Sequence, residues 1–320
     1  MLFFDQNLTQ AATYSKPAPS QPTSVAARLV ADIGWAYQVM NQSHHADLRQ
    51  QGKFLLRTLL HFRASASWFR FLRNSYLHDI AHTEPGLIEA IHRPFFDKNI
   101  CAKHRVRLLK GHFELLPSLL GSRQAGDVMS GNRVQLCQFE GKHGEQCSLM
   151  MLRDDAFKRE GGITLALNFD GQTLLYLTFT MLRQGQKTVI KVGGIQSSKH
   201  CCRDMLRKAT HSLHGIQPRL LLIEALRGIA QQMDCSHIEC ISKLNHIYGA
   251  WRYRLKKIIH AEYDQLWLLA GATVNNRGNF DLPLSGEQKP IESRPSNKRS
   301  EYRRRGVLLE SIQQQLRLAR

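Results

Sequence analysis

The sequence predicts a mixed α+β fold in which a helical N-terminal region precedes an antiparallel-rich sheet flanked by helices. From Val25 to about Leu120, apolar residues recur at helical spacing and β-branched runs are few. From residue 131 onward, short apolar runs alternate with turn residues, as they do in a meander of antiparallel strands. Beyond residue 198, helical patterns surround the short run HIECIS (237–242), which predicts a further strand between helices.

The composition is that of a folded, basic protein. The chain has 320 residues, of which 42% are hydrophobic and 22% are charged, so it can bury a sizeable core. Its 44 lysines and arginines exceed its 26 aspartates and glutamates, for a net charge of +18. Such a surface attracts anionic lipid, nucleic acid or phosphate-rich substrates. We do not expect nucleic acid as the partner, because no recognised nucleic-acid-binding motif accompanies the charge.

The chain carries no visible signal for export or membrane insertion. No run approaches the roughly 18 apolar residues of a membrane span, and the start lacks a basic segment followed by an apolar one. The seven cysteines form no CxxC motif, and the Cys and His clusters lack zinc spacing. We therefore expect a cytoplasmic protein without disulfides and without a bound metal.

Shifts in composition divide the chain into four segments. Residues 1–24 are rich in Ser, Thr, Pro and Ala and are expected to form a flexible arm. Residues 25–130 form the helical N-terminal region, with breaks at its prolines. Residues 131–284 form the α+β domain, and residues 285–320 form a basic C-terminal tail with a helix.

Local signals order the elements of the α+β domain. The strongest is a hairpin turned by Asp170 and Gly171 between two apolar runs, followed by the strand TVIKVGG. Two helices are expected at about 199–213 and 218–233, with Pro218 in the first turn of the second. The segment 263–284 reads as strand and loop.

Several phrases in the second half of the chain carry a family resemblance. They are VGGIQ (192–196), LHGIQPRLLLIEALRGIA (213–230), NHIY (245–248), YDQLW (263–267), FDLP (280–283) and SNKRSEYRRR (296–305). In wording and order they resemble the VirK/YbjX family of Gram-negative bacteria. The resemblance implies a virulence-associated role, tolerance of host antimicrobial peptides and handling of envelope or surface components. It implies no reaction and no catalytic residue.

The order of the elements is also similar to the core of the GNAT acyltransferase superfamily. Antiparallel strands lead to KTVIKVGGIQ, a helix from Pro218, the strand HIECIS and a further helix. The resemblance implies that one strand splays and that a helix N-terminus holds a pyrophosphate. It also implies an acyl-coenzyme A or an acyl carrier as donor, whereas the residues themselves identify no cofactor.

Two groups of residues are candidates for contact with such a donor. Gly193, Gly194 and Gln196 end a strand, where adjacent glycines permit close approach of a ligand or, alternatively, a bulge or a tight exit from the sheet. His214, Gly215 and Arg219 frame the start of a helix. That position suits an anion, and a plain interhelical turn is the alternative.

Two titratable residues are candidates for proton transfer. Glu224 lies in an apolar helical stretch and could act as a general base, or it could form an ordinary ion pair with Arg227. His246 follows the strand HIECIS and could carry a proton near neutral pH, or it could stack in the core.

The stretch 53–75 reads as one basic amphipathic helix. Its Phe, Leu and Trp side chains alternate with arginines, of which Arg63, Arg70 and Arg73 are expected to contact anions or an anionic membrane surface. The alternative is a helix packed on the domain with solvated arginines.

Two hypotheses for the function follow. The first is an accessory protein at the cytoplasmic face of the inner membrane, with anionic lipid or envelope proteins as partners. The second is a GNAT-like acyltransferase acting on an envelope-related acceptor. The first ranks higher because neither loop carries the glycine-rich phosphate-binding signature of the superfamily. The sequence assigns no oligomeric state.

Overall fold

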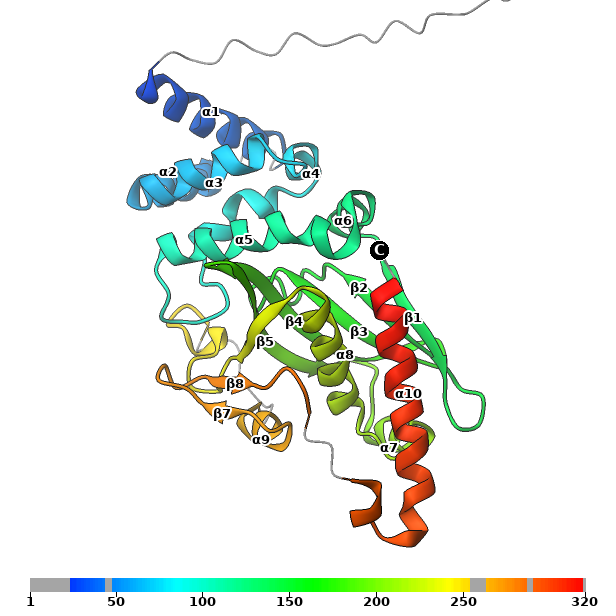
Figure 1. Ribbon diagram of the computed structural model, residues 1–320. Helices are drawn as coiled ribbons and strands as arrows, with labels where there is room; N and C mark the ends of the chain where they lie inside the picture. The colour runs from blue at the N-terminus through cyan, green and yellow to red at the C-terminus, as the bar shows by residue number, and fades with distance from the viewer. Residues whose placement is uncertain (1–23, 44–47, 254–262, 287–289, 319–320) are drawn as a thin grey trace, which may run out of the picture.

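The structure is a computed structural model that describes residues 24–43, 48–253, 263–286 and 290–318. The arm expected for residues 1–24 lies outside these residues except for Ser24. Figure 1 shows the N-terminal helices gathered above the sheet and two later helices in front of it.

The N-terminal region is helical, as the sequence predicts. Its elements are α1 (Val25–Ser43), α2 (Leu48–Leu60), α3 (Phe62–Arg73), α4 (His78–Thr83), the 3-10 helix η1 (Pro85–His92), α5 (Ala102–Leu120) and α6 (Ser122–Met129). The helix α5 continues through Pro117 to its C-cap at Gly121.

The single helix expected over 53–75 is instead two helices that meet at His61. The rings of Phe54 and Phe69 lie 5.9 Å apart, whereas a continuous helix would separate the two residues by about 22 Å of rise. Both side chains are buried. Folding back at His61 therefore buries two aromatic rings that a straight helix would leave far apart.

The eight strands found among the described residues belong to one sheet, which confirms the α+β class. The strands are β1 (Val134–Glu140), β2 (Gln146–Leu152), β3 (Ile163–Phe169), β4 (Gln172–Gln184), β5 (Lys187–Ser197), β6 (Cys235–Cys240), β7 (Thr273–Val274) and β8 (Phe280–Leu282). Their order is β1-β2-β3-β4-β5-β6-β8-β7. Neighbours are antiparallel except β5 and β6, which run parallel.

The hairpin between β3 and β4 forms where turn chemistry predicts it. Asp170 and Gly171 have φ values of +47° and +76°, the two left-handed residues that a type I′ turn requires. Gly and Asp tolerate this region, and the twist of the turn matches that of the strands. The turn therefore sets the pairing of β3 with β4 next to it, where Phe169 lies opposite Gln172.

Helices cover the sheet and share its core. They are α7 (Arg203–Ser212), α8 (Pro218–Gln232), α9 (Tyr263–Leu269) and α10 (Arg299–Leu318), with the short 3-10 helices η2 (Ile247–Gly249), η3 (Ile291–Ser293) and η4 (Ser296–Lys298). The helix α8 packs on β3 to β6, α10 packs on α8 and β1, and α5 packs on β4. At Gly111 a Cβ atom would lie 2.9 Å from the Cβ of Leu182, so this glycine lets α5 approach β4 closely.

The sequence predicts strand and loop over residues 263–284, and this prediction is wrong for the first part of the segment. Residues Tyr263–Leu269 form α9, and the strands β7 and β8 follow it. Tyr263, Leu266 and Trp267 share the buried face of α9, and the Trp267 indole donates to the Ile241 carbonyl at 2.8 Å. The i, i+3, i+4 spacing of these three residues is helical, but the helix is too short to stand out in the sequence.

Within the described part of the chain, none of the helices combines the length and the apolar character that crossing a bilayer requires.

Two buried histidines make stability depend on pH. Burial lowers the pKa of His92 to about 4 and that of His112 to about 3. His112 is fully buried and its Nδ1 accepts a hydrogen bond from the Met181 N–H, which requires the neutral ring. The unfolded chain takes up protons near pH 6.5, whereas the folded chain resists them.

We therefore expect the free energy of unfolding to fall as the pH drops below about 6.5, by about 2 kcal/mol per histidine at pH 5. Urea unfolding at a series of pH values measures this. His112→Gln should reduce the slope, and the same change at the exposed His200 should not. A stability that does not change between pH 7 and pH 5 would contradict the assignment.

Candidate functional site

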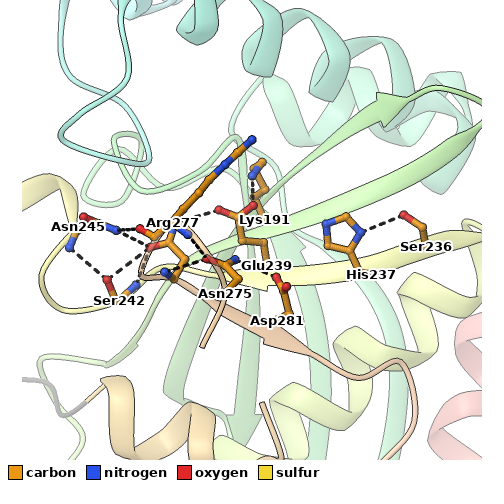
Figure 2. A network of polar contacts seen from close by, with 10 residues as sticks. Lys191, Ser236, His237, Glu239, Ser242, Asn245, Asn275, Arg277 and Asp281 are labelled. Carbon is orange, nitrogen blue, oxygen red and sulfur yellow. Dashed lines mark hydrogen bonds and ion pairs between the residues drawn. The ribbon is translucent and has the colours of Figure 1, made fainter. Parts of the chain in front are cut away.

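A buried ion pair joins the two parallel strands. Lys191 of β5 lies opposite Glu239 of β6 in the register, and the Lys191 ammonium donates to the Glu239 carboxylate. Their exposed fractions are only 8% and 5%. Figure 2 shows the two side chains pointing toward one another from neighbouring strands. Buried charges at this depth persist only when they are paired and hydrogen-bonded.

Amide side chains complete the hydrogen bonding of the pair. Asn279 donates its Nδ2 to Glu239 at 2.8 Å, and its Oδ1 accepts from Asn245 Nδ2 at 3.0 Å and from the Ser242 N–H at 3.2 Å. Asn245 also donates to the Arg277 carbonyl at 2.9 Å. The network therefore ties the loop before β8 and the segment after β6 to one carboxylate (Figure 2).

A second carboxyl group, that of Asp97, lies in the same pocket. The pocket has a volume of about 480 Å³, and its polar lining includes Asp97, His104, Arg107, Lys191, Glu239 and Arg277. The loop that carries Asp97 lies against the segment that follows β6, because the Lys98 N–H donates to the Asn245 carbonyl at 3.1 Å. We call this the ion-pair pocket.

The two carboxyl groups have pKa values shifted in opposite directions. Burial alone would raise the pKa of Glu239, but the Lys191 charge and the hydrogen bonds from Lys191 and Asn279 outweigh it and lower that pKa. Burial raises the pKa of Asp97, and the nearby charge of Glu239 adds to this rise. Environments that push the pKa values of two titratable groups apart are typical of acid–base sites.

Phe96 holds a strained conformation beside the ion pair. Its φ is +62°, which is uncommon for an aromatic residue, and its N–H donates to the Arg159 carbonyl at 2.7 Å. The ring lies 5.4 Å from Lys191 Nζ, within range of a cation–π interaction. The strained backbone therefore delivers an aromatic face to the buried ammonium.

The glycines of β5 make room for a buried acid, Glu160. The register of β4 and β5 shifts at Gly193, which is a bulge. A Cβ atom at Gly193 would lie 1.8 Å from the Glu160 carbonyl oxygen, and one at Gly194 would lie 2.6 Å from its carboxylate. Gln196 donates to both carboxylate oxygens at 2.5 and 2.6 Å. Gly193, Gly194 and Gln196, which the sequence predicted to contact an acyl donor, therefore lie against Glu160 of the protein itself.

His246 lies in an aromatic stack beside this acid. Its ring is fully buried and stacks on Tyr263 at 5.2 Å, and it meets the Tyr248 ring edge-on at 5.0 Å. Its Nδ1 accepts from the Tyr248 N–H at 3.3 Å. Burial and then the Glu160 charge raise the pKa of Tyr248 and of Tyr263. The stack adjoins the ion-pair pocket, because Asn245 of the pocket precedes His246 in the chain and His246 forms an antiparallel β-bridge with Asp97.

Comparison with known proteins identifies the family of the chain. Residues 43–318 match the family described as protein of unknown function DUF535. The chain belongs to the DUF535 family. It is 32% identical to the uncharacterized protein YbjX of Escherichia coli strain K12, over 85% of this chain and 83% of that protein. It is 23% identical to an uncharacterized protein of Haemophilus influenzae, over 68% of this chain and 72% of that protein. No solved structure matches the chain.

In this DUF535 protein, the predicted base Glu224 lies in an ion pair. Its carboxylate accepts from Arg227 at 2.5 Å, and Arg227 also donates to the carbonyls of Pro283 at 2.9 Å and Ala270 at 2.7 Å. The pair therefore ties α8 to the segments before β7 and after β8. The structure does not bring Glu224 into the ion-pair pocket or into the contacts of His246.

The turn before α8 is covered by α10. His214 and Gly215 both have positive φ, and the His214 carbonyl accepts from Arg305 Nε. A Cβ atom at Gly215 would lie 2.3 Å from the Arg305 guanidinium and 2.5 Å from Glu301. Arg219 is exposed one residue into the helix. The family phrases HGIQPR and SEYRRR therefore contact each other.

The three predicted surface arginines have different surroundings. Arg70 and Arg73 bind the buried Asp32 of α1, at 2.9 and 3.4 Å, and join α3 to α1. Arg63 is exposed and lines a large groove next to α5. The three side chains are therefore not one patch.

Sequence reasoning identified Gly193, Gly194, Gln196 and His246 in the cluster around Glu160, but it missed Glu160 itself and the charged residues of the ion-pair pocket. Lys191 and Glu239 are charges inside otherwise apolar strands, and that signal could have marked them. Asp97, Asn279 and Glu160 lie in loops, where no periodicity marks them. Within the described residues no group of three His, Cys, Asp or Glu side chains has the arrangement of a metal site.

We expect strong coupling between Lys191 and Glu239. Glu239→Gln and Lys191→Met should each cost about 3–5 kcal/mol, because each leaves one buried charge unpaired. The double variant should be more stable than either single one, since Gln keeps an acceptor for Asn279. A double-mutant cycle by urea unfolding measures the coupling. The exposed pair Lys187–Asp234 is the control and should couple by less than about 1 kcal/mol. Additive single effects in the buried pair would contradict this.

The fit of Glu160 against β5 can be tested at the glycine. Gly193→Ala should destabilise the protein by at least about 2–3 kcal/mol, because its Cβ would overlap the backbone of Glu160. Gly34→Ala in α1 meets no heavy atom within 4 Å and should stabilise by about 0.5–1 kcal/mol. Thermal unfolding compares the two variants, and an unchanged Tm for Gly193→Ala would show that the loop of Glu160 lies elsewhere.

Proposed function

We propose that this DUF535 protein is an acyltransferase that binds a polar acceptor in the ion-pair pocket. The support from the fold is the order of the elements: antiparallel strands lead to a parallel pair, β5 and β6, joined through α8, with β8 antiparallel beside β6. The sequence resemblance to the GNAT superfamily rests on the same order. A bulge at Gly193 bends β5 where its pairing with β6 ends.

The observation that carries the proposal is the placement of two carboxyl groups, Asp97 and Glu239, in one pocket beside the buried Lys191 ammonium. Asp97, whose pKa burial raises, is the better proton acceptor near neutral pH. Glu239, held ionised by Lys191, keeps the pocket polar and orients an acceptor beside it. The pocket volume of about 480 Å³ suits a small polar group.

The proposed step is attack of an acceptor hydroxyl or amine on an acyl thioester. The acceptor gives its proton to Asp97 as its oxygen or nitrogen bonds to the carbonyl carbon. The tetrahedral intermediate then breaks the C–S bond, and Asp97 returns the proton to the released thiolate, which regenerates its carboxylate. The donor would be an acyl-coenzyme A or an acyl carrier thioester. We assign it no binding residues, because Glu160 fills the space at Gly193 and Gly194 and Arg305 covers Gly215.

A second candidate function is favoured by the surface of α2. Leu55, Leu56, Leu59 and Leu60 are exposed there beside Lys53, which suits peripheral contact with an anionic membrane. In that case the protein is a virulence-associated accessory factor at the cytoplasmic face of the inner membrane. It would serve envelope or surface components and tolerance of host antimicrobial peptides, as the VirK/YbjX resemblance implies, with envelope proteins as partners.

Release of free thiol from acyl thioesters tests the first proposal. With a panel of hydroxyl and amine acceptors, the wild-type protein should show acceptor-dependent thiol release. Asp97→Asn should lower kcat/KM by about 10²–10⁴-fold, since it removes the proton acceptor. Asp204→Asn, at an exposed residue of α7, is the matched control and should leave the rate unchanged. A rate for Asp97→Asn equal to that of the wild type would exclude this role.

A further inference from the structure

A second and larger hollow lies between the α2–α3 turn and α5. Its volume is about 1280 Å³, above the roughly 300–1,000 Å³ of ordinary small-ligand pockets. One wall is formed by Leu59, Leu60 and Phe62 around the turn, and the other by the first half of α5, including Val106. Leu182 of β4 also lines it. We call this hollow the α2–α5 groove.

Three apolar side chains on one wall of the α2–α5 groove are exposed to solvent. Leu59 is 68% exposed, Leu60 is 69% exposed and Phe62 is 39% exposed. Three large apolar side chains that adjoin a hollow are unusual on a surface without a ligand or partner. The hydrophobic effect favours the removal of these side chains from water, and a ligand that enters the groove would cover them.

The same groove is lined by many basic side chains and by few acidic ones. Its lining includes six lysines and arginines, Arg63, Lys103, Arg105, Arg107, Lys110 and Arg183, and a single acidic side chain, Glu114. Among the described residues, no carboxylate lies within ion-pair distance of these six cations. Lys110 donates instead to Ser67 Oγ at 2.9 Å. The charge of the groove therefore complements an anion.

The groove adjoins the ion-pair pocket. Arg107 and Leu182 line both hollows, and His104, which lines the pocket, follows Lys103 of the groove. The two hollows therefore share part of their lining. A groove with apolar side chains and a cationic rim suits a molecule with one long apolar part and one anionic part.

We infer that the α2–α5 groove binds one acyl chain of a monomeric anionic amphiphile, such as a fatty acid or a lysophospholipid. The chain lies against Leu59, Phe62 and Val106, and the carboxylate or phosphate is held by the arginines and lysines of the rim. The inference concerns binding alone and goes beyond acyl transfer. If the proposed function also holds, it names the substrate class as a long-chain acyl compound.

The native cysteines supply a direct measure of occupancy. Cys101 is exposed and lines the groove, whereas Cys202 is exposed elsewhere. Lysophosphatidylglycerol, kept below its critical micelle concentration, should slow alkylation of Cys101 by about tenfold at ten times its Kd. Alkylation of Cys202 in the same sample should not change. Peptide mass spectrometry follows both residues, and the zwitterionic lysophosphatidylcholine should protect much less.

Matched surface variants separate binding from folding. Leu59→Gln and Arg107→Gln should each weaken protection, because they remove apolar contact or an anion partner. Val307→Gln, 67% exposed on α10, and Arg207→Gln, exposed on α7, are the controls and should protect like wild type.

Three outcomes would overturn the inference: no protection by the anionic lipid, equal protection by the zwitterionic one, or protection by anionic vesicles alone, which would assign the surface to a membrane. Because the readout is occupancy, a protein that binds the lipid but releases no thiol would disprove acyl transfer and leave this site intact.

Discussion

The buried charge pair between two parallel strands is the constraint on which the C-terminal half of the protein depends. Lys191 and Glu239 meet only in the observed register of β5 and β6, since a shift of one residue would turn one side chain to the other face of the sheet. The carboxylate then fixes Asn279, and Asn279 fixes Ser242 and Asn245. One register therefore decides the place of β6, of the loop before β8 and of the segment that closes the pocket around Asp97.

A second contact, between Glu160 and the bulge of β5, brings together phrases that are distant in the sequence. Gly194 and Gln196 come from VGGIQ, His246 and Tyr248 from NHIY, and Tyr263 from YDQLW. All of them contact Glu160 or one another. Three of the phrases that carry the family resemblance therefore pack around one buried carboxylate.

Elements with strong local signals could be predicted from the sequence. Turn chemistry at Asp170 and Gly171 and the alternation of apolar residues gave the hairpin, and these signals act over a few residues. The break at His61 has no Gly or Pro to mark it and depends on packing of Phe54 against Phe69. The helix α9 has only seven residues, too few for a clear period.

The candidate site was less predictable because it is assembled from distant parts of the chain. Glu224 and His246 drew attention as isolated titratable groups in apolar surroundings, and the structure gives both of them partners within the core. Asp97 and Glu239 differ in sequence position by more than the length of the whole sheet meander, and backbone contacts of the Asp97 loop with Asn245 and His246 bring the two carboxyl groups to one pocket. Non-local pairing of this kind leaves no periodic trace.

The excess of positive charge separates into structural and unexplained parts. Arg70 and Arg73 neutralise a buried aspartate, and Arg227 neutralises Glu224, so the fold itself accounts for these cations. Among the described residues, the basic side chains around the α2–α5 groove neutralise no buried carboxylate, and like charges gathered on one rim repel each other. Exposed leucines beside them add a further cost in water. An arrangement that is unfavourable on both counts in the free protein becomes favourable once an anionic, apolar molecule occupies the groove.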